Sequence, residues 1–146
     1  MRYTITVKGA PRGKGRPRFT KDGHAYTDEK TRAYEKKIRD AWQSEYKESP
    51  LEMPLDVYVL AYYPIPKSWS KVKQKEAEAG LIRPTVKPDA DNILKMVDAL
   101  NGVAWIDDKQ IVSMACKKHY STEPRLIIDI ETQDWLLNTG ESNGTD

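Results

Sequence analysis

A chain of 146 residues with 38% hydrophobic side chains and a formal net charge of +2 is long enough for one modest core. No apolar run approaches the ~20 residues of a membrane-spanning helix, which excludes an integral membrane protein and favours a soluble single domain. The single cysteine, Cys116, excludes an intrachain disulfide, and the N-terminus has no apolar signal region. We therefore expect a cytoplasmic protein.

The N-terminal region is strongly basic. After an alternating strand over residues 1–7, residues 9–18 form a loop rich in glycine and proline, and no acidic side chain occurs before residue 22. Small residues let the backbone approach a ligand, while arginine and lysine neutralise phosphates. A flexible, solvated run of charge is the alternative, although the flanking strand and hairpin argue against a free tail. The candidate DNA contacts are Arg12, Lys14, Arg16 and Arg18.

A hairpin and a long helix are expected next. Asp22-Gly23 suits a tight two-residue turn between residues 18–21 and 24–27. Thr27 is placed to cap the helix that follows. Large apolar side chains recur along that helix at four-residue spacing, which predicts a core-facing stripe rather than a base-stacking surface. The stripe consists of Tyr34, Ile38, Trp42 and Tyr46.

A second strand and a charged helix follow. Residues 55–63 are rich in β-branched and aromatic side chains and predict the strand. Residues 67–70 introduce a short helix to about Ala79, with Gly80 as its stop. Its lysines are secondary candidates for DNA contact, although the solvated face of an ordinary surface helix has the same composition. These candidates are Lys67, Lys71 and Lys73.

Two aspartates two residues apart, Asp89 and Asp91, follow Pro88. Side chains at i and i+2 point apart on a helix but share one face when extended, so the pair can converge only at or before a helix start. The proline and the Asp-Asn composition both favour a helix start here. We expect the helix to run from about Asp91 to Leu100.

One side of this helix is polar. Asp91, Lys95 and Asp98 lie at i, i+4 and i+7, opposite an apolar side that packs inward. Asn101-Gly102 is a helix stop, and residues 103–106 predict a short return strand. The polar stripe should therefore face a site.

The return strand ends at Asp107-Asp108, which adds carboxylates near the helix. Mg²⁺ prefers oxygen ligands and is often held by one or two carboxylates together with substrate phosphate. Asp89, Asp91 and Asp108 could supply such a site, which suits metal-dependent phosphoryl transfer. The alternative is that these aspartates only form turns and caps. An EF-hand calcium loop is excluded, because its sixth and twelfth positions need glycine and glutamate and both are leucine here.

The C-terminal part predicts two strands, over residues 111–121 and 125–132, which should form an antiparallel pair. Hairpin neighbours mixed with helical crossovers favour an α+β fold, in which a mixed or antiparallel sheet packs with helices in two layers over residues 1–132. Residues 133–146 read as a polar C-terminal tail, with residues 135–137 as a candidate docking segment.

The order of these motifs resembles the RusA family of Holliday-junction endodeoxyribonucleases. The shared features are the basic Gly/Pro loop, Pro-Asp-x-Asp-Asn-x-x-Lys from residue 88, Asp-x-Leu-x-Gly from residue 98, and a hydrophobic residue followed by Asp-Asp-x-Gln-Ile from residue 106. The resemblance covers most of residues 1–131, and residues 87–112 are its most specific part.

The resemblance implies a homodimer that binds four-way DNA junctions and resolves them by paired nicks during recombination and repair. It implies Mg²⁺, with Mn²⁺ as a substitute, and no organic cofactor. Asp89, Asp91 and Asp108 match the family's catalytic carboxylates, and Lys95 matches its lysine. Asp107, beside Asp108, is an alternative metal ligand. A cytoplasmic protein that joins the nucleoid when bound to DNA would follow.

Two other functions fit the same residues. A non-catalytic branched-DNA-binding protein would use the basic loop for phosphate contacts, while its aspartates only capped turns. A nuclease of broader branched-DNA specificity would share the carboxylates, because junction choice depends on dimer geometry and loop shape. Metal-dependent cutting separates the first of these from a resolvase.

Overall fold

The computed structural model describes residues 1–132 of the chain. The predicted tail over residues 133–146, with its docking segment, lies outside the described residues. Within residues 1–132 no helix is long and apolar enough to cross a bilayer. The elements are β1 (Arg2–Lys8), β2 (Arg18–Phe19), β3 (Ala25–Tyr26), α1 (Glu29–Glu45), β4 (Leu55–Pro64), α2 (Lys71–Glu78), α3 (Ala90–Met96), the 3₁₀ helices η1 (Val97–Leu100) and η2 (Asp108–Gln110), β5 (Ile111–Ser121) and β6 (Arg125–Thr132).

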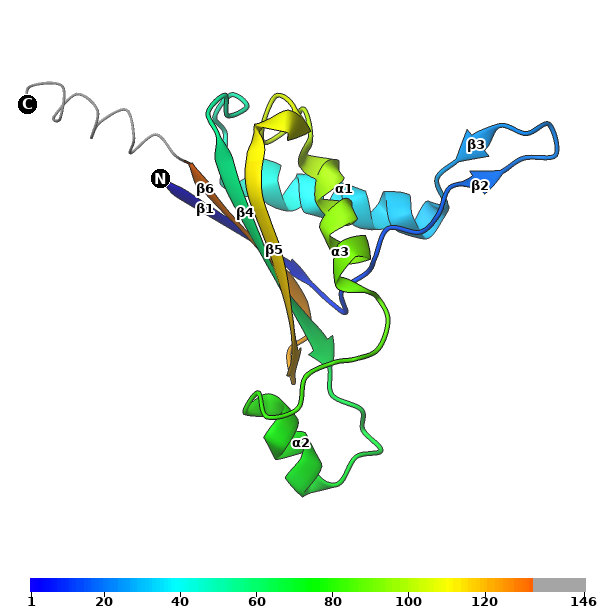
Figure 1. Cartoon of the computed structure of the whole chain (residues 1–146), viewed down its shortest axis with the longest axis vertical. Helices are drawn as coiled ribbons and strands as arrows, with labels where there is room; N and C mark the ends of the chain where they lie inside the picture. Colours follow the sequence, from blue (N-terminus) through cyan, green and yellow to red (C-terminus); the bar gives the residue numbers. More distant parts are fainter. Residues whose placement is uncertain (133–146) are drawn as a thin grey trace, which may run out of the picture.

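Four strands form the central sheet, in the order β1-β6-β4-β5. Strand β6 runs antiparallel to both of its neighbours, whereas β4 and β5 run parallel. A parallel pair needs a long crossover connection, and here the crossover contains α2 and α3 (Figure 1). The predicted α+β fold with a mixed sheet is confirmed.

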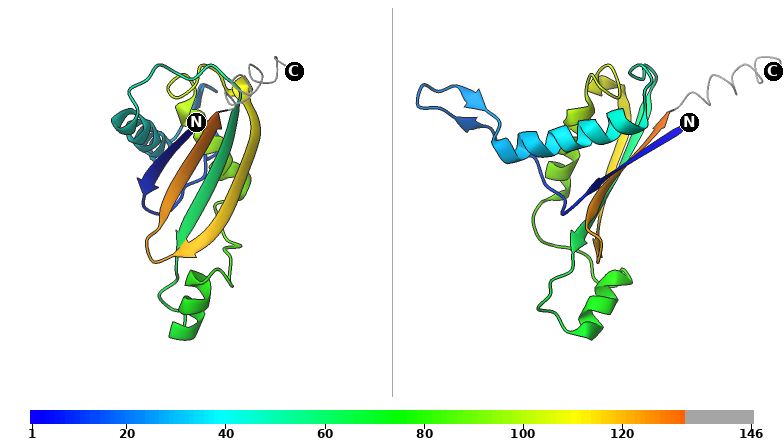
Figure 2. Two further views of the ribbon diagram at one scale, coloured as in Figure 1. Left: turned by 90° about the vertical axis from the view of Figure 1, so that its left-hand side faces the viewer. Right: turned by 180° about the vertical axis from the view of Figure 1, so that it is seen from behind.

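Helices α1 and α3 cover one face of the sheet, and α2 lies beyond the end of β4 (Figures 1 and 2). Burial alternates along β1, which places Tyr3 and every second residue after it in the core. From α1, Tyr34, Ile38 and Trp42 are buried, and the Trp42 ring lies 5.5 Å from the Tyr3 ring between centroids. Tyr46 is partly buried against the same cluster. The stripe is therefore core, as predicted.

Strands β5 and β6 do not pair with each other, so the predicted antiparallel pair is wrong. Strand β6 lies between β1 and β4, and β5 lies on the far side of β4, at the sheet edge. The run Leu126–Ile128 gives β6 consecutive apolar side chains, which is typical of a strand buried among others. Residues 117–119 of β5 are Lys-Lys-His, and charged side chains suit an edge strand. The apolar content of β6 favours the interior position.

Two predictions around the β2–β3 hairpin are wrong in detail. The turn has three residues rather than two, because the Thr20 amide donates to the His24 carbonyl at 2.9 Å and Gly23 adopts the left-handed conformation (φ 83°). The cap of α1 is Asp28 and not Thr27. The Asp28 carboxylate accepts a hydrogen bond from the backbone amide three residues later at 2.7 Å.

Residues 103–106 form a turn rather than the predicted return strand. Gly102 (φ 77°) ends the helical segment as expected, and its amide donates to the Trp105 carbonyl at 2.7 Å. Trp105 is fully buried and makes only isolated bridges, with Leu51 and Asn101. The turn places the Trp105 indole in the core. Strand-like pairing in this segment is therefore limited to the bridges of Trp105.

A polar cluster on the sheet face away from α1 joins β1 to β6. Asp129 is 8% exposed and accepts hydrogen bonds from the Arg2 guanidinium and the Thr4 hydroxyl. The hydrogen bond from Arg2 is the main reason that the pKa of Asp129 lies below its usual value.

The substitution Asp129→Asn should lower the free energy of unfolding near neutral pH. It should also make the decrease of that free energy with falling pH less steep than in the wild type. Because the folded pKa is depressed, the carboxylate stabilises the fold above its unfolded pKa of about 4, and this contribution disappears as pH falls through the folded pKa. Urea unfolding from about pH 7 to about pH 2 measures both effects. Asp22→Asn, at the hairpin tip, is the control. Parallel pH profiles for Asp129→Asn and the wild type would contradict the role of Asp129.

Candidate active site

The start of α3 carries the first two predicted carboxylates. Asp89 occupies the N-cap position with an extended backbone, but its side chain makes no capping hydrogen bond. Asp91 lies in the first turn. The Tyr63 hydroxyl donates to the Pro88 carbonyl and so fixes this segment against β4. Helix capping therefore does not account for the Asp89 carboxylate, which stays available to a ligand.

The polar stripe lies opposite the core, as its spacing predicted. The apolar side chains on the inner side of α3 and η1 are at most 4% exposed. Because that side is fixed in the core, Asp91, Lys95 and Asp98 face outward. The buried side chains are those of Ile93, Met96, Val97, Ala99 and Leu100.

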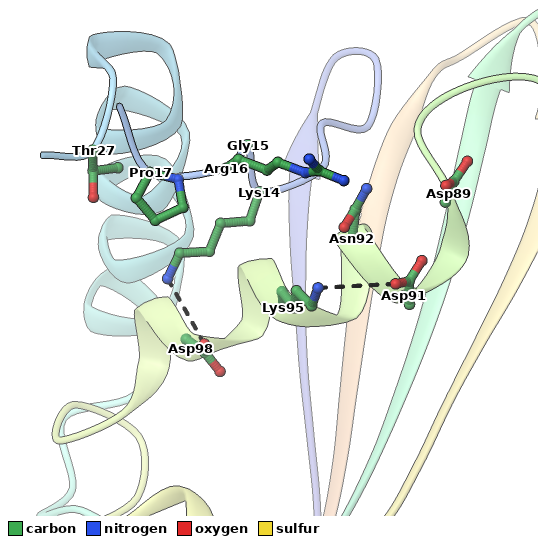
Figure 3. Close-up of a pocket in the computed structure, with 10 residues that line it drawn as sticks. All are labelled: Lys14, Gly15, Arg16, Pro17, Thr27, Asp89, Asp91, Asn92, Lys95 and Asp98. Atoms are coloured by element: carbon green, nitrogen blue, oxygen red, sulfur yellow. Dashed lines mark ion pairs between the residues drawn. The ribbon is translucent and has the colours of Figure 1, made fainter. Parts of the chain in front are cut away.

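An open pocket of about 620 Å³ lies between α3 and the basic loop (Figure 3). Its walls come from residues 14–17 of the loop, from Thr27 and from the polar side of α3 and η1. In it, the Lys95 ammonium lies 3.9 Å from the nearer Asp91 oxygen. The pocket thus brings cations of the loop to the carboxylates of α3. The predicted site residues that line it are Lys14, Arg16, Asp89, Asp91 and Lys95.

Gly13 and Lys14 seat the basic loop directly on α3. The Lys14 amide donates to the Asn92 carbonyl at 2.9 Å. A Cβ atom on Gly13 would lie 2.9 Å from the Cβ atoms of both Asn92 and Pro88. Glycine is therefore required at residue 13 for this close approach.

Substitution Gly13→Ala should lower the free energy of unfolding by about 1–3 kcal/mol, because the new methyl group forces the loop or α3 to move. Gly15→Ala is the matched control in the same loop. Its Cβ would meet an Asp28 carboxylate oxygen at 3.2 Å, the end of a side chain that can shift. Denaturant unfolding of both variants measures the difference. Equal midpoints would show that the loop does not pack on α3 in this way.

Two carboxylates near the Lys14 ammonium were not among the predicted site residues. The Lys14 ammonium lies 3.7 Å from Asp98 and 3.9 Å from Glu35 (Figure 3 shows the first pair). Asp98 was recognisable from its position seven residues after Asp91, on the same helix side, whereas no local pattern places Glu35 of α1 beside the loop. Burial, followed by the charge of Asp108, raises the pKa of Asp98 despite the nearby Lys14.

The Asp107-Asp108 pair divides into two different roles. Asp107 caps η2: its carboxylate accepts from the Lys109 amide at 2.9 Å, and its own amide donates to the Gln110 side chain at 2.8 Å. Asp108 accepts a hydrogen bond from the Trp105 indole N–H at 2.8 Å. Asp108 does not line the pocket but lies near its Asp98 end. The capping hydrogen bonds of η2 account for the position of the Asp107 carboxylate. The buried Trp105 indole orients the Asp108 carboxylate.

The carboxylates near the pocket meet part of the coordination needs of a divalent cation. Over residues 1–132, no three Asp, Glu, His or Cys side chains are grouped as metal ligands, so Asp89, Asp91 and Asp108 do not form a closed site. Asp89 and Asp91 nevertheless present exposed carboxylates to one pocket. Mg²⁺ is often held by one or two carboxylates with substrate phosphate and water completing its shell. The donor set fits a cation of that kind.

The other predicted DNA-binding cations lie outside this pocket. Arg12 and Arg18 line a second cavity beside the β2–β3 hairpin. Lys67, Lys71 and Lys73 lie at or before the first turn of α2, beyond the end of the central sheet (Figure 1), and none of them lines the pocket. The structure therefore brings together only part of the predicted basic surface.

Comparisons with known proteins identify the family of the chain. The sequence profile described as Endodeoxyribonuclease RusA matches residues 8–131, a range that contains the basic loop, α3 and the Asp107-Asp108 pair. The chain is also 39% identical over 132 residues to the Bacillus subtilis (strain 168) protein named "Uncharacterized protein YqaN". That alignment covers 86% of this chain and 93% of the relative. The chain therefore belongs to the RusA endodeoxyribonuclease family.

Proposed function

We propose that this protein is a Mg²⁺-dependent endodeoxyribonuclease that resolves four-way DNA junctions by phosphodiester hydrolysis during recombination and repair. The observation that carries the proposal is the pocket that Asp89 and Asp91 line together with Lys14 and Arg16 of the basic loop. Carboxylates suit a divalent cation, and the loop cations suit a phosphodiester. Membership of the RusA family supports the reaction type.

The residues of the pocket have separate tasks. Asp89 and Asp91 would hold the cation, with Asp108 as a further carboxylate near the Asp98 end. When bound, Mg²⁺ supplies polarisation of the phosphate and a bound water of lowered pKa. Arg16 binds and orients the DNA backbone from the loop side, because a guanidinium matches phosphate oxygens in geometry and charge.

Lys95 is the cation of α3 that faces the pocket. Its ammonium lies 3.9 Å from Asp91, and the side chain is 60% exposed, so phosphate can reach it. A positioned cation at this point stabilises negative charge that develops on the phosphate during hydrolysis. Mn²⁺ can replace Mg²⁺ in such a site, because both ions accept oxygen ligands.

The symmetry of a four-way junction also bears on the oligomeric state of the protein. A four-way junction has two-fold symmetry, and its resolution needs cuts in two strands. A homodimer with an isologous interface presents two equivalent sites for these cuts. Each chain would contribute one pocket of the kind described above.

Cleavage of a labelled four-way junction, beside a linear duplex of the same sequence, tests the proposal. We expect symmetric paired nicks in the junction with Mg²⁺ or Mn²⁺, no nicks with EDTA, and little cutting of the duplex. Junction binding without cutting in any metal would identify a DNA-binding protein instead. Equal cutting of flaps, forks and junctions would identify a nuclease of broader branched-DNA specificity.

A further inference from the structure

The cations of the basic loop are divided between two pockets. Lys14 and Arg16 line the pocket on α3, whereas Arg12 and Arg18 line a second pocket, also of about 620 Å³. The loop therefore forms a wall of both pockets. The second pocket lies where the β2–β3 hairpin meets the start of α1, and the hairpin projects from there away from the central sheet (Figure 1). Its lining is Arg12, Arg18, Tyr26, Asp28, Glu29 and Lys30.

An aromatic ring and a guanidinium share one side of the hairpin at this pocket. Arg18 of β2 and Tyr26 of β3 are direct cross-strand neighbours, so their side chains lie on the same face. Tyr26 is 46% exposed, a large fraction for an aromatic side chain beside a cavity. An exposed tyrosine ring next to cations is the combination that proteins use to stack a base and bind its phosphate.

The cations of the second pocket are not engaged in close ion pairs among residues 1–132. Lys14 and Lys95 of the first pocket form ion pairs, but Arg12, Arg18 and Lys30 form none within 4 Å among residues 1–132. Three cations face two carboxylates in this lining. One carboxylate, that of Asp28, is already used to cap α1. The pocket therefore keeps a positive balance suited to a phosphodiester.

A further basic cavity continues from this pocket along α1. A smaller cavity of about 180 Å³ shares Arg12 and Lys30 with it and extends along α1 to Lys37. Lys30 and Lys37 are seven residues apart and so lie on one side of the helix. Phosphates on either side of a bound nucleotide would meet positive charge along this line.

We propose that the second pocket binds one unstacked nucleotide of branched DNA, with its base on the Tyr26 ring and its phosphate between Arg12 and Arg18. This inference rests on the proposed function and deepens it, because it names a feature that distinguishes a branch from a duplex. Bases in a duplex are covered by their neighbours, whereas an unpaired or opened position exposes a base face for stacking. Selection of branched DNA would then begin beside the cleavage pocket.

Binding titrations in EDTA separate this inference from catalysis. The probes are a fluorescent four-way junction, a single-stranded oligonucleotide and a linear duplex. Tyr26→Ala should weaken binding of the junction and of the single strand by about 10-fold and leave the duplex nearly unchanged. Tyr26→Phe keeps the ring and should bind like the wild type. Arg12→Ala should weaken all three probes and make their salt dependence shallower.

Tyr58→Ala is the matched control, since Tyr58 is 39% exposed on β4 and lines neither pocket. Two results would overturn the inference. In the first, Tyr26→Ala binds all three probes as tightly as Tyr58→Ala does. In the second, Tyr26→Ala weakens binding of the duplex as much as binding of the junction. Junction cleavage by the wild type in Mg²⁺ is measured in parallel. Its absence would count against the proposed function, while the binding titrations judge the nucleotide pocket independently.

Discussion

Asp91→Asn is expected to abolish junction cleavage while junction binding is kept or strengthened. The change removes one of the two carboxylates that α3 presents to the pocket and preserves the shape of the side chain. Loss of an outer partner of a metal site already costs about 10–100-fold, so loss of a direct ligand should lower the cleavage rate by at least about 100-fold. Binding should not fall, because a negative charge is removed from the path of the phosphates.

The control for this variant is Asp40→Asn on α1. Asp40 is also an exposed helical carboxylate and forms an i,i+4 ion pair with a lysine, Lys36, at 2.7 Å. Its replacement should leave both cleavage and binding unchanged. Cleavage is measured as the single-turnover rate of nicking, and binding is titrated in EDTA. If Asp91→Asn lost binding as severely as cutting, Asp91 would be a DNA contact or a folding residue rather than a metal ligand.

Lys95→Ala should lower the single-turnover rate by about 100- to 1,000-fold, the usual cost of removing a group that stabilises transition-state charge. Its effect on stability should be small. The ion pair with Asp91 spans 3.9 Å between exposed side chains, and an i,i+4 pair of this kind contributes only about 0.5 kcal/mol. A large kinetic loss in a variant that unfolds at the same denaturant concentration would assign Lys95 to the reaction.

The structure offers a closely matched comparison for Lys95. Lys36→Ala removes the lysine of another exposed i,i+4 ion pair, with a side-chain exposure of 70% against 60% for Lys95. Both variants should have similar stability, but only Lys95→Ala should lose activity. If Lys95→Ala cleaved the junction at the wild-type rate, the lysine would serve only as the ion-pair partner of Asp91. Partial activity in Lys95→Arg would support a requirement for positive charge at this position.

Several features of the site could be predicted because they depend on near neighbours in the chain. Pro88 and the aspartates after it are typical of a helix start, and the helix begins there. The spacing of Asp91, Lys95 and Asp98 indicated a polar side, and the buried residues of α3 and η1 confirm it. The same spacing could have added Asp98 to the site. Helical periodicity is a local property, so the sequence alone is sufficient for it.

Other features were decided by contacts between distant parts of the chain. Strand β6 lies between β1 and β4 because its apolar side chains are buried there, although the short connection to β5 predicted an adjacent pair. Asp107 and Asp108 are adjacent in sequence and chemically identical. Only the hydrogen bonds of η2 and of Trp105 distinguish their roles.

The basic loop is the clearest case in which local sequence predicted the chemistry and distant contacts decided the arrangement. Its composition predicted phosphate contacts, but composition could not divide its cations between two pockets or place Glu35 beside Lys14. Both follow from the packing of Gly13 against Asn92 of α3, a residue that is distant in the chain. The sequence by itself determined most of the helices and strands and the chemistry available to this protein. Tertiary structure decided which charged groups meet, because those contacts depend on packing between segments that carry no local signal of one another.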